Sequence, residues 1–111
     1  MLDIASTRLL CEFKEVNLTR EQHLLLKLSE ECTEVGKVVH KAVLFGLDDG
    51  YPGTDRTNLD DLRHELNDLF AVVEMLYPVI EWRIDSDAVK TKKAKVEHWI
   101  KYAQERGILD T

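Results

Sequence analysis

Glycine and proline are scarce in this sequence, with five glycines and two prolines among 111 residues. Because these residues interrupt regular secondary structure, their scarcity favours a mostly helical chain. Long apolar runs are missing, and the N-terminal stretch lacks the charged, apolar and small-residue regions of a signal peptide. We therefore expect a cytoplasmic chain without a membrane partner.

Cysteine is also rare, since Cys11 and Cys32 are the only two and they do not form a CxxC motif. In a chain without a signal peptide we expect reduced thiols rather than a disulfide. Positive charge is in deficit as well, and the net charge of −6 disfavours binding to a nucleic-acid backbone. The length of 111 residues suits one domain, spanning residues 1–111.

Hydrophobic periodicity predicts two long helices. Apolar residues recur at alternating spacings of three and four in two stretches, Leu25, Leu28, Cys32, Val35, Val39 and Ala42, and then Leu62, Leu66, Leu69, Val73, Leu76 and Ile80. Thr19 begins the first helix, where Gln22 completes a capping-box pattern, and Gly46 ends it. Thr57 or Asn58 caps the second helix, and Pro78 lies near its end.

The remaining segments are shorter or more polar. We expect a short helix in the first fifteen residues and a lysine-rich helix over residues 88–106, which stops at Gly107. Residues 46–57 read as a loop rich in glycine and aspartate. That loop lacks the alternating ligands and the twelfth-position glutamate of a calcium-binding loop.

Together these elements predict an all-α fold. We expect a helical bundle with two long antiparallel helices, a short N-terminal helix and a basic C-terminal helix. One copy offers little cover for two apolar seams, so we expect homo-oligomerisation, as a homodimer or homotetramer, to complete the bundle.

Two pairs of acids interrupt the long helices. Glu31 and Glu34 form the first pair, Glu65 and Asp68 the second, and each pair has i,i+3 spacing. At 100° per residue, Glu31 and Glu65 fall within the apolar arcs, and their partners lie at the edges. Carboxylates there cost stability unless something neutralises them, so we expect a divalent cation.

The donor types narrow the choice of cation. Ligation by oxygen alone suits Mg²⁺, with Mn²⁺ as a second possibility, better than zinc. The sequence "HELND" begins like the HExxH motif of zinc proteases, but Asp68 replaces the second histidine. A di-iron bundle would need ExxH twice, and neither pair has it.

These acids carry a family resemblance over residues 20–105. "EECTE", which contains Glu30, Glu31 and Glu34, and "ELND", which contains Glu65 and Asp68, resemble the EExxE…ExxD signature of the MazG-like all-α nucleoside triphosphate pyrophosphohydrolases. The segments "KAVLFGLDDGYPGTDRTN" and "KTKKAKVEHWIKYA" are similar to those of the small single-domain bacterial and phage members.

The resemblance implies Mg²⁺-dependent cleavage of a (deoxy)nucleoside triphosphate to the monophosphate and pyrophosphate, for nucleotide-pool control or house-cleaning. It implies a metal site formed by Glu31, Glu34, Glu65 and Asp68. Glu30 and Glu34 become candidate catalytic acids. The basic residues that it places near the substrate phosphates are Lys27, Lys92, Lys93 and Lys95.

Two other functions remain open at this point. The chain could be a non-catalytic helical dimerisation or regulatory module in which the acids bind a structural ion. It could also be a hydrolase for a diphosphate or a phosphoribosyl-type compound. Trp82 and Trp99 are expected to be packing residues, although either could stack on a base.

Overall fold

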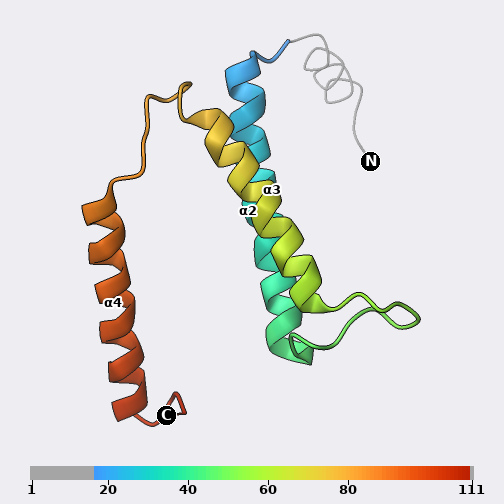
Figure 1. Cartoon of the computed structure of the whole chain (residues 1–111), viewed down its shortest axis with the longest axis vertical. Coiled ribbons are helices and arrows are strands. Elements are labelled where there is room, and N and C mark those ends of the chain that lie inside the picture. The colour runs from blue at the N-terminus through green and yellow to red at the C-terminus, as the bar shows by residue number, and fades with distance from the viewer. Residues whose placement is uncertain (1–16, 111) are drawn as a thin grey trace, which may run out of the picture. The chain divides into compact units, whose positions relative to one another are not determined.

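The structure is a computed structural model, described here for residues 17–110. Within that range it contains three helices and no strand: α2 Arg20–Phe45, α3 Asn58–Leu76 and α4 Ser86–Glu105 (Figure 1). The all-α prediction is thus confirmed for the described residues. The helix predicted for residues 1–15 lies outside them. The chain divides into two compact units, Met1–Glu81 and Trp82–Thr111.

Helix α2 begins and ends where its sequence predicts. The Thr19 hydroxyl accepts a hydrogen bond from the Gln22 backbone N–H, and the Gln22 side chain accepts one from the Thr19 backbone N–H, both at 3.0 Å. This reciprocal pairing satisfies two amide groups that a helix start otherwise leaves without partners. At the other end, Gly46 adopts a φ of 101°, a conformation that glycine allows at little cost.

The loop between α2 and α3 is closed by specific hydrogen bonds. The buried Asn58 side chain donates to the Gly46 carbonyl at 2.8 Å, and the Leu59 N–H donates to the Leu47 carbonyl at 2.9 Å. Thr57, one of the two predicted caps, is the N-cap of α3 and forms a capping box with Asp60. The loop therefore returns the chain directly into α3.

Helices α2 and α3 lie side by side and run in opposite directions (Figure 1). Among the described residues, the buried apolar side chains are Leu24, near the start of α2, and Leu76, at the end of α3. Both come from the same end of the antiparallel pair. Tight packing is therefore concentrated where α3 stops, two residues before Pro78.

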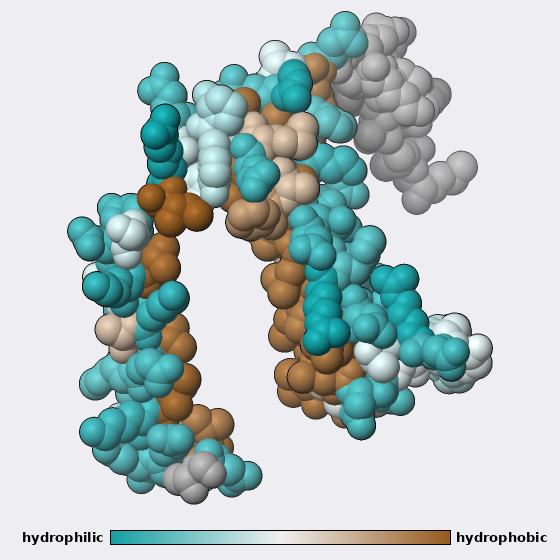
Figure 2. Space-filling model, viewed as in Figure 1, coloured by the Kyte–Doolittle hydropathy of each residue, from teal (hydrophilic) through white to brown (hydrophobic). Residues whose placement is uncertain are grey.

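The two predicted apolar seams are only partly covered. Leu28 and Val35 of α2 are half-buried, whereas Leu25 and Val39 remain 43% and 42% exposed. On α3, the seam residue Leu66 is 46% exposed, and Phe70, beside the seam, is 54% exposed. Figure 2 shows hydrophobic surface along this helix pair, down to the end where α2 finishes. Each seam thus has a side that α2–α3 packing leaves uncovered.

Helix α4 starts two residues before the predicted position, at Ser86. The reason is that Asp85 caps it, with its Oδ1 accepting from the backbone N–H groups of Asp87 and Ala88 at 3.0 and 3.1 Å. No residue of α4 is buried, and hydrophobic residues follow one of its sides (Figure 2). Within residues 17–110, no helix has the length and apolar character needed to cross a bilayer.

Candidate metal centre

The four acids of the two pairs lie on the half-buried faces of α2 and α3. Glu31 and Glu34 of α2 and Glu65 and Asp68 of α3 are all half-buried, whereas Glu30 is exposed. Helical residues three apart are neighbours on one face, which explains why both members of each pair share this environment. The antiparallel packing of α2 on α3 then brings acids from different helices toward one another.

The pKa of the Glu31 carboxyl reflects its partial burial and the proximity of acids from the two helices. Its pKa lies above the ordinary value of 4.5, chiefly because partial burial disfavours the charged form, and next because Asp68 and Glu65 add negative charge nearby. Glu31 comes from α2 and the other two from α3. Glu31 is therefore an electrostatic neighbour of two carboxylates that lie more than thirty residues away in sequence.

Helix α3 contributes a compact group of donor atoms. One ligand atom from each of His64, Glu65 and Asp68 lies within 4.8 Å of the other two, and His64 Nε2 is 3.4 Å from Asp68 Oδ2. From the sequence, His64 was considered only as the first histidine of an HExxH motif, which Asp68 interrupts. The signal was available in the i,i+4 spacing of His64 and Asp68, which puts both on one helix face.

Glu30 and Lys27 form an ion pair instead of joining this group. Lys27 Nζ lies 3.0 Å from a Glu30 carboxylate oxygen, one helical turn away. The hydrogen bond and the negative charge of Glu30 raise the pKa of Lys27. Glu34 lies on the half-buried face of α2 but does not belong to the donor group on α3. Of the two candidate catalytic acids, only Glu34 thus lies on the same helix face as Glu31.

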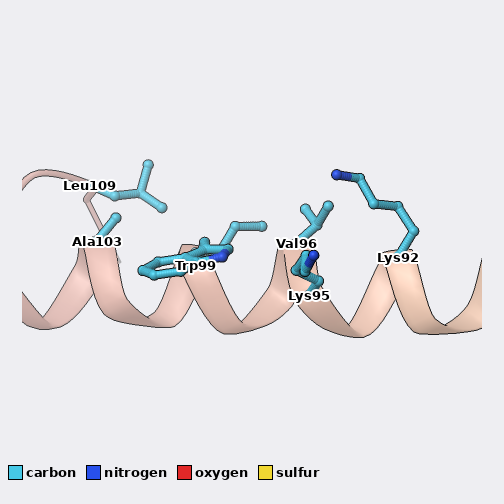
Figure 3. Close-up of a pocket in the computed structure, with 7 residues that line it drawn as sticks. Lys92, Lys95, Val96, Trp99, Ala103 and Leu109 are labelled. Carbon is cyan, nitrogen blue, oxygen red and sulfur yellow. The ribbon is translucent and has the colours of Figure 1, made fainter.

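Lys92 and Lys95 occupy a separate part of the chain, on α4. They line an open hollow of about 410 Å³ together with Val96, Trp99, Ile100, Ala103 and Leu109. Figure 3 shows Trp99 between Val96 and Ala103, with Lys92 at the N-terminal end of the row. The hollow combines an apolar floor with two cationic side chains, and Lys93 is exposed on the same helix.

The donor set is chemically suited to a divalent cation. Carboxylate oxygens are the ligands that Mg²⁺ and Mn²⁺ prefer, and a cation among Glu31, Glu65 and Asp68 would remove the repulsion that raises the Glu31 pKa. The acids of the 46–57 loop do not form such a group within the described chain. No protein-family model, curated protein or solved structure matches this chain. The assignment of this centre therefore depends on its own residues.

The position of Glu31 predicts a pH dependence of stability. Because its pKa is raised in the folded protein, the folded state holds this proton more tightly than the unfolded chain does. The free energy of unfolding should therefore fall as pH rises above 4.5, the ordinary value, until the higher folded-state pKa is passed.

Glu31→Gln removes the charge, so we expect a higher thermal unfolding midpoint for the variant at neutral pH in EDTA. The difference should shrink as pH falls toward 4.5. Adding Mg²⁺ should stabilise the wild type more than the variant. Calorimetry from acidic to neutral pH measures both effects. A variant less stable than the wild type at neutral pH in EDTA would contradict this account of Glu31.

Proposed function

We propose that this protein is a metal-dependent nucleotide pyrophosphohydrolase of the MazG-like type. It would cleave a (deoxy)nucleoside triphosphate between the α and β phosphates, yielding the monophosphate and pyrophosphate. The observation that supports this most is the approach of Glu31 on α2 to Glu65 and Asp68 on α3. These three acids stand in the EExxE and ExxD segments whose order resembles that family.

In this proposal, Glu31, Glu34, Glu65 and Asp68 would hold Mg²⁺, or Mn²⁺, and such an ion would supply positive charge to offset the phosphates and to lower the pKa of water. A water oxygen attacks a phosphorus of the α–β bridge and the bridging P–O bond breaks, releasing pyrophosphate. Glu34 would accept the proton of that water through a carboxylate oxygen not used by the metal, because Glu30 is paired with Lys27.

In this proposal, the lysines neutralise part of the negative charge of the substrate. A triphosphate is strongly anionic, so an acidic site needs cations beside the metal to hold it. Lys27 is one turn before Glu31 on α2 and would contact a phosphate if it exchanged its Glu30 partner. Lys92 and Lys95 are the corresponding candidates on α4, where Trp99 between apolar side chains offers a stacking surface for a base.

We further propose that a second copy, in a homodimer or homotetramer, covers the exposed apolar side of the α2–α3 pair. The exposed residues on that pair include Leu25, Val39, Val43, Leu66, Phe70 and Met75. Exposed apolar surface along a helix pair is a common feature of subunit interfaces.

The proposed oligomer can be tested by measuring the sedimentation of the wild type and of a variant at the exposed apolar side. Wild-type protein should sediment as a dimer or tetramer, and Phe70→Asp should shift it toward the monomer, because an aspartate at a 54% exposed apolar position opposes burial. Tyr51→Asp, at a 78% exposed position in the loop, is the matched control and should leave the mass unchanged. A wild-type protein that sediments as a monomer would contradict the proposal.

The function itself is tested by incubating the protein with each common ribo- and deoxyribonucleoside triphosphate and Mg²⁺, with and without EDTA. Ion-exchange chromatography separates the products. We expect monophosphate and pyrophosphate, lost when EDTA is added, and the panel also ranks the bases. Release of orthophosphate would contradict cleavage at the α–β bridge. Folded protein that cleaves no triphosphate would favour the non-catalytic helical module.

A further inference from the structure

His64 stands out among the four histidines of the chain because it is within the donor group on α3. Its Nε2 faces Asp68 Oδ2 at 3.4 Å, and Glu65 supplies a further oxygen within 4.8 Å of both. His64 is outside the acid pattern on which the proposed function is based, so it adds a nitrogen donor that this pattern lacks.

The spacing of these atoms is compatible with shared ligation of one metal ion. A charge-assisted N–H···O contact is normally about 2.7–2.9 Å long, which is shorter than this separation. Two donor atoms bound to one ion at about 2.1 Å, with a tetrahedral angle between them, lie about 3.4 Å apart. The separation of His64 and Asp68 is therefore one at which both could bind the same first-row metal ion.

The exposure of His64 leaves room for an ion. Its side chain is 57% exposed and that of Asp68 is 45% exposed, so neither is locked in place by packing. An exposed i,i+4 pair of this kind adds little to helix stability, which gives it weak value as a purely structural contact. A cation bridging the two side chains would also reduce the negative charge that Asp68 and Glu65 impose on Glu31.

We propose that His64 is a metal ligand, and that together with Glu65 and Asp68 it makes this centre bind first-row transition ions by a nitrogen contact that Mg²⁺ does not use. Imidazole nitrogen is a favourable ligand for Co²⁺ and Zn²⁺, whereas Mg²⁺ selects oxygen. The inference rests on the proposed metal site, and it changes the expected occupant from Mg²⁺ or Mn²⁺ held by oxygen alone to an ion of mixed nitrogen and oxygen preference.

The experiment is a pair of calorimetric titrations of the full chain, with Co²⁺ and with Mg²⁺, at neutral pH. His64→Ala should weaken Co²⁺ binding by at least about tenfold. Its Mg²⁺ affinity should change by less than about twofold, because Mg²⁺ does not rely on nitrogen. The visible absorption spectrum of bound Co²⁺ should change in the variant, since it loses a nitrogen ligand.

His40→Ala is the matched control, because His40 is an exposed helical histidine outside the donor group. It should bind both ions as the wild type does. Alanine is favourable in helices, so both variants should retain their circular dichroism. Equal Co²⁺ affinity and an unchanged spectrum in His64→Ala would overturn the proposal, and so would a wild type that binds no Co²⁺.

These titrations need no substrate, so their outcome is separable from that of the triphosphate panel. Normal triphosphate cleavage with unchanged Co²⁺ binding in His64→Ala would contradict the proposal that His64 is a ligand and would support the proposed enzyme. Weakened Co²⁺ binding without any triphosphate cleavage would support the ligand and remove the proposed reaction.

Discussion

Glu65→Gln should abolish metal-dependent triphosphate cleavage, lowering kcat/KM by more than about 100-fold. Glu65 belongs to the donor group on α3 and also contributes to the raised pKa of Glu31. The substitution keeps the shape of the side chain but removes its charge. Steady-state kinetics with the best triphosphate from the panel measures the loss, and circular dichroism checks that the helices remain.

The control is Glu74→Gln, which makes the same change at an exposed position of the same helix. It should retain wild-type kinetics. In EDTA, Glu65→Gln should be at least as stable as the wild type, because it relieves repulsion among carboxylates. A Glu65→Gln protein that unfolds, together with a wild type indifferent to Mg²⁺, would instead indicate that the acids form a structural network.

Leu76→Ala should have the largest effect on stability. Leu76 is 2% exposed, the lowest exposure among the buried side chains of the described chain. Deleting the outer carbons of a buried leucine loses transfer free energy and leaves a cavity, which together cost about 2–5 kcal/mol. Urea denaturation followed by circular dichroism measures the free energy of unfolding, at a fixed protein concentration because oligomers dissociate on dilution.

Leu18→Ala provides the comparison, since Leu18 precedes α2 and is 52% exposed. Its effect should be within about 0.5 kcal/mol. Equal losses for the two variants would mean that the packing where α2 begins and α3 ends does not stabilise the helix pair as described.

Helix ends could be predicted because they depend on nearby residues. The Thr19–Gln22 capping box and the Gly46 stop involve only local hydrogen bonds and local backbone preference. The start of α4 was misplaced by two residues because the prediction began the helix at the apolar pattern. Because the Asp85 side chain caps the helix, Ser86 and Asp87 belong to its first turn.

The candidate metal centre likewise has one part that follows from local sequence and one part that depends on tertiary packing. That each pair of acids shares a helix face follows from i,i+3 spacing and was predicted. Glu31 lies near Glu65 and Asp68 because of the register of α2 against α3. The loop and its Asn58–Gly46 hydrogen bond help to set that register. The i,i+4 spacing of His64 and Asp68 could be read from the sequence, but it was weighed only as an incomplete HExxH motif. The structure adds the 3.4 Å separation of His64 Nε2 and Asp68 Oδ2.

The sequence by itself thus determined the helices, their caps and the pairing of acids within each helix, since these are set by contacts a few residues apart. Only the tertiary structure decided which part of each apolar seam α2–α3 packing covers, leaving Leu66 exposed while Leu76 is buried. The physical reason is that periodicity specifies the direction of a side chain around its own helix. It does not specify which neighbouring element will remove that side chain from water.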